Sequence, residues 1–165
     1  MNVEVVRGDI TAMAVEVLVT AANKSLAGGG GVDGAIHRAA GPELLSALRP
    51  LAPCLPGDAV ITPAFRLPAP VRFVVHAVGP RYGVDEPAGE LLQSAYLAAL
   101  RHCDEVGAQS VAFPSLSTGA YHFPLFDACR ISVAALAAAN TSVSRCVLVA
   151  FDQKTERFWK RELSQ

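Results

Sequence analysis

The sequence shows little sign of a membrane segment, and we expect no export signal. No apolar run reaches the roughly 18 residues that a membrane-spanning helix requires, and the longest candidate, from Ile131 to Ala139, is rich in alanine and follows Arg130. The N-terminus has no basic flank leading into an apolar signal core. We therefore expect a buried helix near Ile131, no membrane partner and a cytoplasmic location.

An excess of one charge sign is also absent. The chain has 14 Lys and Arg against 15 Asp and Glu, which gives a formal net charge of −1. Domains that bind long nucleic acid usually carry a basic excess. The composition therefore argues against long nucleic acid as a partner, but it is compatible with a small anionic ligand.

Cysteine is scarce, and metal-ligand patterns are missing. The cysteines are Cys54, Cys103, Cys129 and Cys146. They form no C-x-x-C pair and fit neither a zinc site nor a compact disulfide framework, so we expect reduced, buried thiols, with a bridge as the alternative. The histidines are His37, His76, His102 and His122. They share no metal-ligand spacing, so we predict neither a metal site nor a cofactor.

The 165 residues suffice for one domain with its own core. Strands are predicted at 3–7, 15–19, 59–62, 72–78, 110–113 and 145–151. Helices are predicted at 35–40, restarting at Pro42, and at 89–106, 124–139 and 152–163. This alternation predicts a single α/β domain over residues 1–165, with a largely parallel sheet between helices and binding sites beyond the carboxyl ends of its strands.

Residues 27–34 carry four consecutive glycines and then a fifth. Each glycine costs about 0.5–1 kcal/mol relative to alanine through lost chain entropy. The functional interpretation is that backbone N–H groups converge on ligand oxygens beside the start of a helix, where any Cβ would clash. The alternative is a mobile connector that binds nothing.

The same run contains G-x-G-x-x-G at Gly29, Gly31 and Gly34. In a dinucleotide-binding fold this motif follows its strand immediately, and an acidic residue lies about twenty positions later. Here several residues separate strand and glycines, and the stretch around Cys54 is rich in proline, so we disfavour that interpretation. The phosphate-binding pattern G-x-x-x-x-G-K-[ST] is absent.

A second loop, residues 115–121, follows a short buried strand and contains Ser117, Thr118 and Gly119. Alone it is compatible with an ordinary turn. Beside the glycine loop it suggests a pyrophosphate site, because that group needs donors on two sides. Neither loop has a basic residue at its centre, so backbone amides would do the binding.

Two polar residues near the glycine loop could carry chemistry. Asn23 ends a strand and Asp33 opens a helix, so folding can bring both to one pocket rim. Asp33 could address a sugar hydroxyl or an attacking water; the alternative is an N-terminal helix cap. Asn23 could orient a hydroxyl; the alternative is a turn asparagine.

Two further residues could contact a base. Asp9 follows the first strand and could accept a hydrogen bond from an adenine amino group, or serve as a turn or cap residue. Phe151 ends the last strand and could stack on a base, or belong to the core. No G-x-S-x-G elbow or Cys–His pairing supports a triad hydrolase.

Five short sequence motifs have to be considered together. They are Gly-Asp-Ile-Thr at 8–11, Ala-Ala-Asn at 21–23, the glycine block through His-Arg-Ala-Ala-Gly at 28–41, His-Ala-Val-Gly-Pro at 76–80 and Phe-Pro-Ser-Leu-Ser-Thr-Gly at 113–119. Together they closely resemble macrodomains of the MacroD type. The match runs in order from about residue 3 to 163, and the block at 28–41 is its most specific part.

This resemblance implies a three-layer α/β/α fold with a mixed, largely parallel sheet. It implies a metal-independent hydrolase that binds ADP-ribose, removes mono-ADP-ribose from acidic protein side chains and deacetylates O-acetyl-ADP-ribose. Its partners would be ADP-ribose and mono-ADP-ribosylated proteins, and we expect a monomer. Which carbon the water attacks, anomeric or acyl, stays open.

The resemblance also implies roles for individual residues. Asn23 and Asp33 match the pair that handles the proximal ribose and the hydrolytic step. The other matching positions are Asp9 and Ile10 at the adenine, with Phe151 and Asp152 closing that end; Gly30, Gly31 and Val32 on one side of the diphosphate; and Ser117, Thr118, Gly119, Ala120 and Tyr121 on the other.

The chain departs from the family pattern at four positions. Thr20 stands where an asparagine is usual, Lys24 where a small polar residue is usual, Ala120 where a bulkier apolar residue is usual, and His122 where glycine is common. These departures bear on rate and substrate preference more than on ligand identity. Two alternative functions stay open: a non-catalytic ADP-ribose reader, and a phosphatase acting on ADP-ribose 1″-phosphate.

Overall fold

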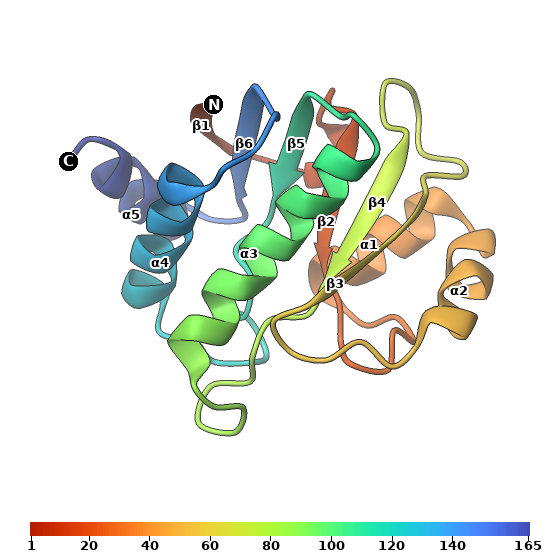
Figure 1. Ribbon diagram of the computed structural model, residues 1–165, viewed down its shortest axis with the longest axis horizontal. Helices are drawn as coiled ribbons and strands as arrows, with labels where there is room; N and C mark the ends of the chain where they lie inside the picture. Colours follow the sequence, from red (N-terminus) through yellow and green to blue (C-terminus); the bar gives the residue numbers. More distant parts are fainter.

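A six-stranded sheet forms the centre of the molecule (Figure 1). The structure, a computed structural model, describes all residues from 1 to 165. In sheet order the strands are β1 (Asn2–Arg7), β6 (Arg145–Ala150), β5 (Ser110–Phe113), β2 (Val17–Ala21), β4 (Phe73–Ala77) and β3 (Ala59–Pro63). All neighbouring pairs are parallel except β3 with β4. The carboxyl ends of β2, β5 and β6 therefore meet at one edge of the sheet.

Helices cover both faces of this sheet. One face carries α1 (Gly31–Ala40) and α2 (Glu43–Leu48); the other carries α3 (Ala88–Glu105), α4 (Leu125–Ala138) and α5 (Gln153–Leu163). Two short 3-10 helices complete the chain, η1 (Ile10–Ala12) and η2 (Arg49–Leu51). Figure 1 shows α3 and α4 crossing one side of the sheet, with α1 and α2 on the far side. The predicted three-layer α/β/α architecture with a mixed, mostly parallel sheet is confirmed.

Strand β2 shows why the central strands are apolar on both sides. Leu18 packs into the core beneath α1 and α2, whereas Val17 and Val19 pack into the core beneath α3, α4 and α5. All three side chains are fully buried. A strand covered on both faces needs apolar residues at successive positions, and each such side chain contributes about 1.5–3 kcal/mol of transfer free energy.

Several predicted element boundaries were wrong, and two of them lie next to the site. Helix α1 begins at Gly31, not near Ala35, because Gly30 is the N-cap and the glycines turn the chain directly into the helix. Strand β2 runs to Ala21, two residues past the predicted end, because Thr20 and Ala21 still pair with β4. Both shifts matter for the site, since they put Asp33 inside the first turn of α1 and Thr20 inside the sheet.

All four cysteines are buried and none is bridged, as predicted. Burial raises the pKa of the Cys54 thiol to about 11 and of Cys103, Cys129 and Cys146 to about 12, so these groups stay protonated and unreactive. None of the helices has the length and apolar character needed to span a bilayer.

Candidate functional site

A cleft of ≈ 640 Å³ opens beyond the carboxyl ends of β2, β5 and β6. It is lined by residues 21–23, 29–33, 114–115, 117–121 and 151–152, together with Gly79, Leu125, Val149 and Thr155. Both loops singled out from the sequence thus face one cavity, and its position is typical of ligand sites in parallel α/β sheets.

A second hollow, of ≈ 350 Å³, lies beside β1, α4 and α5. Its lining is almost entirely apolar and includes no carboxylate, histidine or basic side chain. The chemistry of the protein therefore belongs to the cleft at the carboxyl ends of the strands.

The glycines of the first loop differ in how much room they leave for a side chain. A Cβ on Gly34 would lie 2.6 Å from the carbonyl oxygen of Gly29, so only glycine fits there. A Cβ on Gly30 would meet no atom within 4 Å, and its φ of −91° suits any residue. Because Gly30 lines the cleft, the space above its Cα is open to a ligand.

Backbone N–H groups without a protein acceptor gather on both sides of the cleft. The first amides of α1, at Gly31, Val32 and Asp33, have no intrahelical partner, and no other group of the protein accepts from them. The same holds for five consecutive amides of the second loop, those of Ser117, Thr118, Gly119, Ala120 and Tyr121. Two converging rows of free donors are suited to an anion with several oxygens.

The second loop is held in a tight, partly strained conformation. Ser117 has a φ of 67°, which non-glycine residues rarely adopt, and its hydroxyl is buried without a hydrogen-bond partner. A Cβ on Gly79 would overlap that hydroxyl, so Gly79 allows the loop to approach. Thr118 donates to Oγ of Ser115 over 2.9 Å, which closes the turn. The residues that carry the free N–H groups of this loop, 117–121, all line the cleft.

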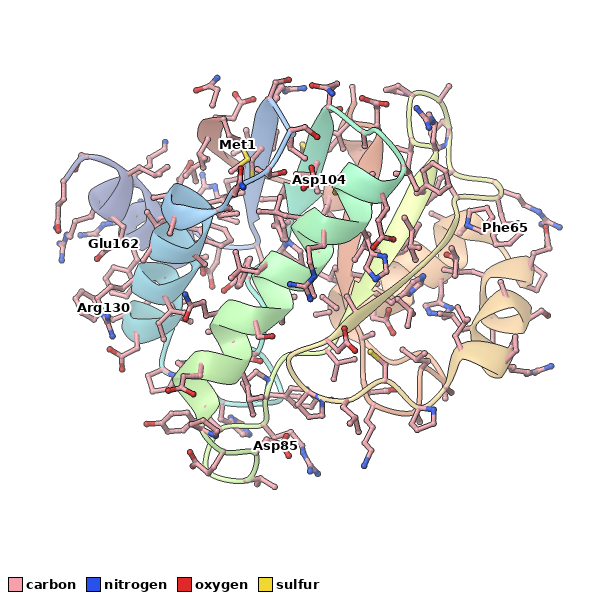
Figure 2. All side chains as sticks on the ribbon, in the orientation of Figure 1. Met1, Phe65, Asp85, Asp104, Arg130 and Glu162 are labelled. Atoms are coloured by element: carbon pink, nitrogen blue, oxygen red, sulfur yellow. The ribbon has the colours of Figure 1, made fainter.

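A neighbouring loop, residues 79–87, braces the second loop from outside. Tyr82 donates its N–H to the carbonyl of Tyr121 over 2.9 Å, and its ring packs on Phe123 with centroids 5.0 Å apart. Arg81 is paired with Asp85, and its hydrogen bonds hold the pKa of that carboxyl below its usual range. Figure 2 shows Asp85 at the lower edge of the view and Asp104 above the centre, and Gly79, at the start of the loop that contains Asp85, lines the cleft.

Asp33 lies in the first turn of α1 with its side chain buried beside the cleft. Its Oδ1 accepts from the Thr20 hydroxyl over 2.9 Å and lies 3.6 Å from Nε2 of His37. Burial raises the pKa of the carboxyl, and the Thr20 hydrogen bond and His37 oppose this in part. Asp33 is not the helix cap, since Gly30 occupies that position and no side chain caps α1.

Asn23 reaches the same region of the cleft. A Cβ built on Gly29 would lie 3.8 Å from both Nδ2 of Asn23 and Oδ2 of Asp33, so the amide and the carboxylate flank this one glycine. The Asn23 side chain also organises the loop: Nδ2 donates to the Gly28 carbonyl over 2.9 Å, and Oδ1 accepts from the Ser25 hydroxyl over 2.9 Å. Asn23 therefore stabilises the turn through its side-chain hydrogen bonds and also lines the cavity.

The four residues expected at an adenine divide into two pairs. Phe151, 85% exposed, and Asp152 line the cleft, and Asp152 caps α5 by accepting from the N–H of Thr155 over 2.8 Å. Asp9 and Ile10 do not line the cleft. Asp9 caps η1 by accepting from Thr11, and Ile10 is buried in the core next to it.

Sequence reasoning missed a buried polar cluster beneath Asp33. His76 on β4 is fully buried, and its Nε2 lies 2.9 Å from the Thr62 hydroxyl, whereas its Nδ1 has no partner. Its ring lies near His37, with centroids 6.3 Å apart. Burial, and secondarily His37, lowers the pKa of His76 to about 3, so the ring is neutral. Polar residues inside buried strands were the one sequence signal for this cluster.

Comparison with known proteins supplies the family context. The Macro domain family model matches residues 19–132. A Macro domain-containing protein of Lactiplantibacillus plantarum is 46% identical over 99% of this chain and 97% of its own length. An O-acetyl-ADP-ribose deacetylase of Citrobacter rodentium is 47% identical over 99% of this chain and 96% of its own.

Solved structures agree with this match. The Oceanobacillus iheyensis macrodomain with ADP superposes with a TM-score of 0.91 at 38% identity, covering 98% of this chain and 90% of that one. The same macrodomain has been solved as a glycine-to-valine mutant with ADPR, with a TM-score of 0.92, and as aspartate-to-alanine and asparagine-to-alanine mutants.

Proposed function

This chain belongs to the Macro domain family, and on that premise we propose that it is an ADP-ribose-binding hydrolase. It deacetylates O-acetyl-ADP-ribose and removes mono-ADP-ribose from acidic side chains of proteins. The observation that carries the proposal is the pair of free amide rows, from the start of α1 and from the second loop, that face one cleft. The relative from Citrobacter rodentium, an O-acetyl-ADP-ribose deacetylase, supports the same assignment.

The diphosphate is the part of the ligand that the amides recognise. No lysine or arginine lines the cleft, so the negative charge is met by N–H groups and by the positive end of the α1 dipole. Gly30, Gly31 and Val32 line one side of the diphosphate, with the free amides of Gly31 and Val32 as donors, and the free amides of residues 117–121 bind from the other side. This mode of binding agrees with the net charge of −1, because it needs no basic patch.

The two ends of the cleft suit different parts of the ligand. The adenine lies toward Phe151 and Asp152, where the exposed ring offers a stacking surface; Asp9 and Ile10 are the further candidates at this end. The proximal ribose lies toward Asn23 and Asp33. An acyl group on that ribose then sits beside the carboxylate.

Asp33 serves as the base of the reaction. Its Oδ1 is bonded to Thr20, while Oδ2 lies toward Gly29 at the cleft wall. A carboxylate whose pKa is raised by burial is a better proton acceptor near neutral pH. Asp33 takes a proton from the attacking water, directly or through a ribose hydroxyl, and Asn23 fixes the ribose. We propose that no resident metal is needed for this step.

The mutants of the relative support the choice of residues. In the Oceanobacillus iheyensis macrodomain the altered asparagine, glycine and aspartate are spaced by 7 and then 3 positions. Asn23, Gly30 and Asp33 have the same residue types and the same spacings, 30 − 23 = 7 and 33 − 30 = 3. These three residues line the cleft in this chain.

Calorimetry with ADP-ribose, followed by two turnover assays, tests the proposal. We expect one ligand per chain, release of acetate from O-acetyl-ADP-ribose, and release of ADP-ribose from a protein modified on acidic side chains. A serine-linked substrate is the control and should stay intact. Absence of binding heat would refute the proposal; tight binding without turnover would identify a reader, and phosphate release from ADP-ribose 1″-phosphate would identify a phosphatase.

A further inference from the structure

Three potential metal ligands converge behind the cleft. One carboxylate oxygen of Asp33 and one ring nitrogen each of His37 and His76 lie within 4.8 Å of one another. Asp33 and His37 are four positions apart on α1, which puts them on one face of the helix. His76 comes from β4, directly across from Thr20 of β2. The cluster thus joins the helix to the sheet at the point where the proposed base is held.

His76 has an unused lone pair inside the protein. Its side chain is fully buried, Nε2 is bonded to Thr62, and Nδ1 has no hydrogen-bond partner. When Nε2 carries the proton and donates it to the Thr62 hydroxyl, Nδ1 is left as a bare acceptor. A buried polar atom without a partner is costly, by about 1–3 kcal/mol. A ligand that accepts this lone pair would recover that cost.

Two threonines orient the cluster from behind. Thr62 fixes the ring of His76, and Thr20 donates to Oδ1 of Asp33 over 2.9 Å, so two of the three ligands have an outer hydrogen-bond partner. Such outer partners are usual around metal-binding histidines and carboxylates, because they fix the tautomer and the direction of the ligand.

We propose that Asp33, His37 and His76 form a binding site for a divalent transition-metal ion, with zinc the best chemical match. Two imidazoles and one carboxylate are a zinc ligand set that leaves a further position open, whereas magnesium and calcium require oxygen ligands. Around zinc the ligand atoms lie roughly 3.4 Å apart, closer than the 4.8 Å limit of this cluster. His37, whose side chain is 17% exposed, can turn inward to close the difference.

Zinc bound at this site would inhibit hydrolysis. This inhibition rests on the proposed function, whereas the metal site itself does not. A metal ion bound to Asp33 takes the lone pairs that the carboxylate needs to accept a proton from water. The ion reaches Asp33 through the cleft, so bound ADP-ribose should hinder its entry. Free zinc would therefore inhibit the hydrolase activity, and a chelator would restore it.

Zinc titration against a chromogenic chelator tests the site without any substrate. The protein is first treated with EDTA and exchanged into buffer with a phosphine reductant. We expect one zinc ion per chain in the parent protein, and at least tenfold weaker binding in both His37→Gln and His76→Gln. The matched control is His122→Asn, which removes an exposed histidine at a φ of 60° that asparagine tolerates; it should bind zinc as the parent does.

A cobalt spectrum gives a second readout of the same site. Cobalt(II) in the parent protein should show visible ligand-field bands without the intense near-ultraviolet band of a thiolate ligand, since the cysteines are not part of the cluster. Zinc binding that persists in His37→Gln, or no binding in the parent protein, would overturn the proposal. Failure of the hydrolase assay would not affect this result, because the titration contains no ADP-ribose.

Discussion

The hydroxyl of Thr20 donates to Oδ1 of Asp33 over 2.9 Å, and both groups are buried between β2 and α1. This single bond fixes which oxygen of the carboxylate faces inward and leaves Oδ2 toward Gly29 and the cleft. It also lowers the pKa of Asp33 against the larger, opposite effect of burial. Thr20, one of the four positions where the chain departs from the pattern of the resemblance, is thus in direct contact with the proposed base.

Loss of the carboxylate should separate binding from catalysis. In Asp33→Asn the amide can still accept from Thr20, so the fold and the cleft should survive. Without a proton acceptor, turnover of O-acetyl-ADP-ribose should fall by about 100-fold or more, the usual size of a general-base effect. ADP-ribose affinity, measured by calorimetry, should be kept or raised because a negative charge near the diphosphate is gone. Full turnover in this variant would remove Asp33 from the mechanism.

The Thr20 hydrogen bond should be visible in the pH profile. Thr20→Val keeps the shape but removes the donor, so the ionised form of Asp33 is less stabilised and its pKa rises further. Because the reaction needs ionised Asp33, the acidic limb of kcat/KM should move to higher pH while the plateau is largely kept. Thr20→Ser, which keeps the hydroxyl, is the control and should follow the parent profile. Identical limbs for valine and serine would contradict this account.

The sequence predicted the sheet and the two loops because these depend on local patterns. Continuous apolar runs identified the strands, and the glycines marked a segment that regular structure cannot explain. The start of α1 was missed since Gly30 and Gly31, normally helix breakers, here form its cap and first residue. The proximity of His37 to His76 could not be predicted, because it depends on β2 and β4 being neighbours in the sheet.

Substitution by alanine should affect stability much more at Gly34 than at Gly30. In Gly34→Ala the new Cβ would meet the Gly29 carbonyl oxygen at 2.6 Å, and overpacking of this kind costs about 1–3 kcal/mol. In Gly30→Ala the Cβ enters open space, so stability should change by less than about 1 kcal/mol. Urea unfolding of both variants measures the difference. Equal losses would mean that Gly30 also has a structural role.

The pKa of His76 predicts how stability depends on acid. Its folded-state pKa of about 3 lies below the ordinary value of 6.5, so folding favours the neutral ring. The stability from this group is complete above pH 6.5 and is lost as the pH falls toward 3, by up to about 1.4 kcal/mol per pH unit. The raised pKa of Asp33 acts in the opposite direction, since acid relieves its buried charge.

His76→Gln separates these two contributions. Glutamine can still bond to Thr62 but does not titrate, so the free energy of unfolding should fall less between pH 6.5 and pH 4.5 than in the parent chain. Urea unfolding at several pH values measures the two slopes. A parent slope no steeper than that of the variant would mean that His76 is protonated in the folded protein.

Phe151 should contribute to affinity and not to stability. The ring is 85% exposed at the edge of the cleft, so Phe151→Ala removes little buried surface and the urea midpoint should stay the same. Stacking of an aromatic ring on a base is worth about 1–3 kcal/mol, so the Kd for ADP-ribose should rise by at least about fivefold. Ribose 5-phosphate, which has no base, is the matched ligand and should bind parent and variant alike. An unchanged Kd for ADP-ribose would mean that the adenine does not stack on Phe151.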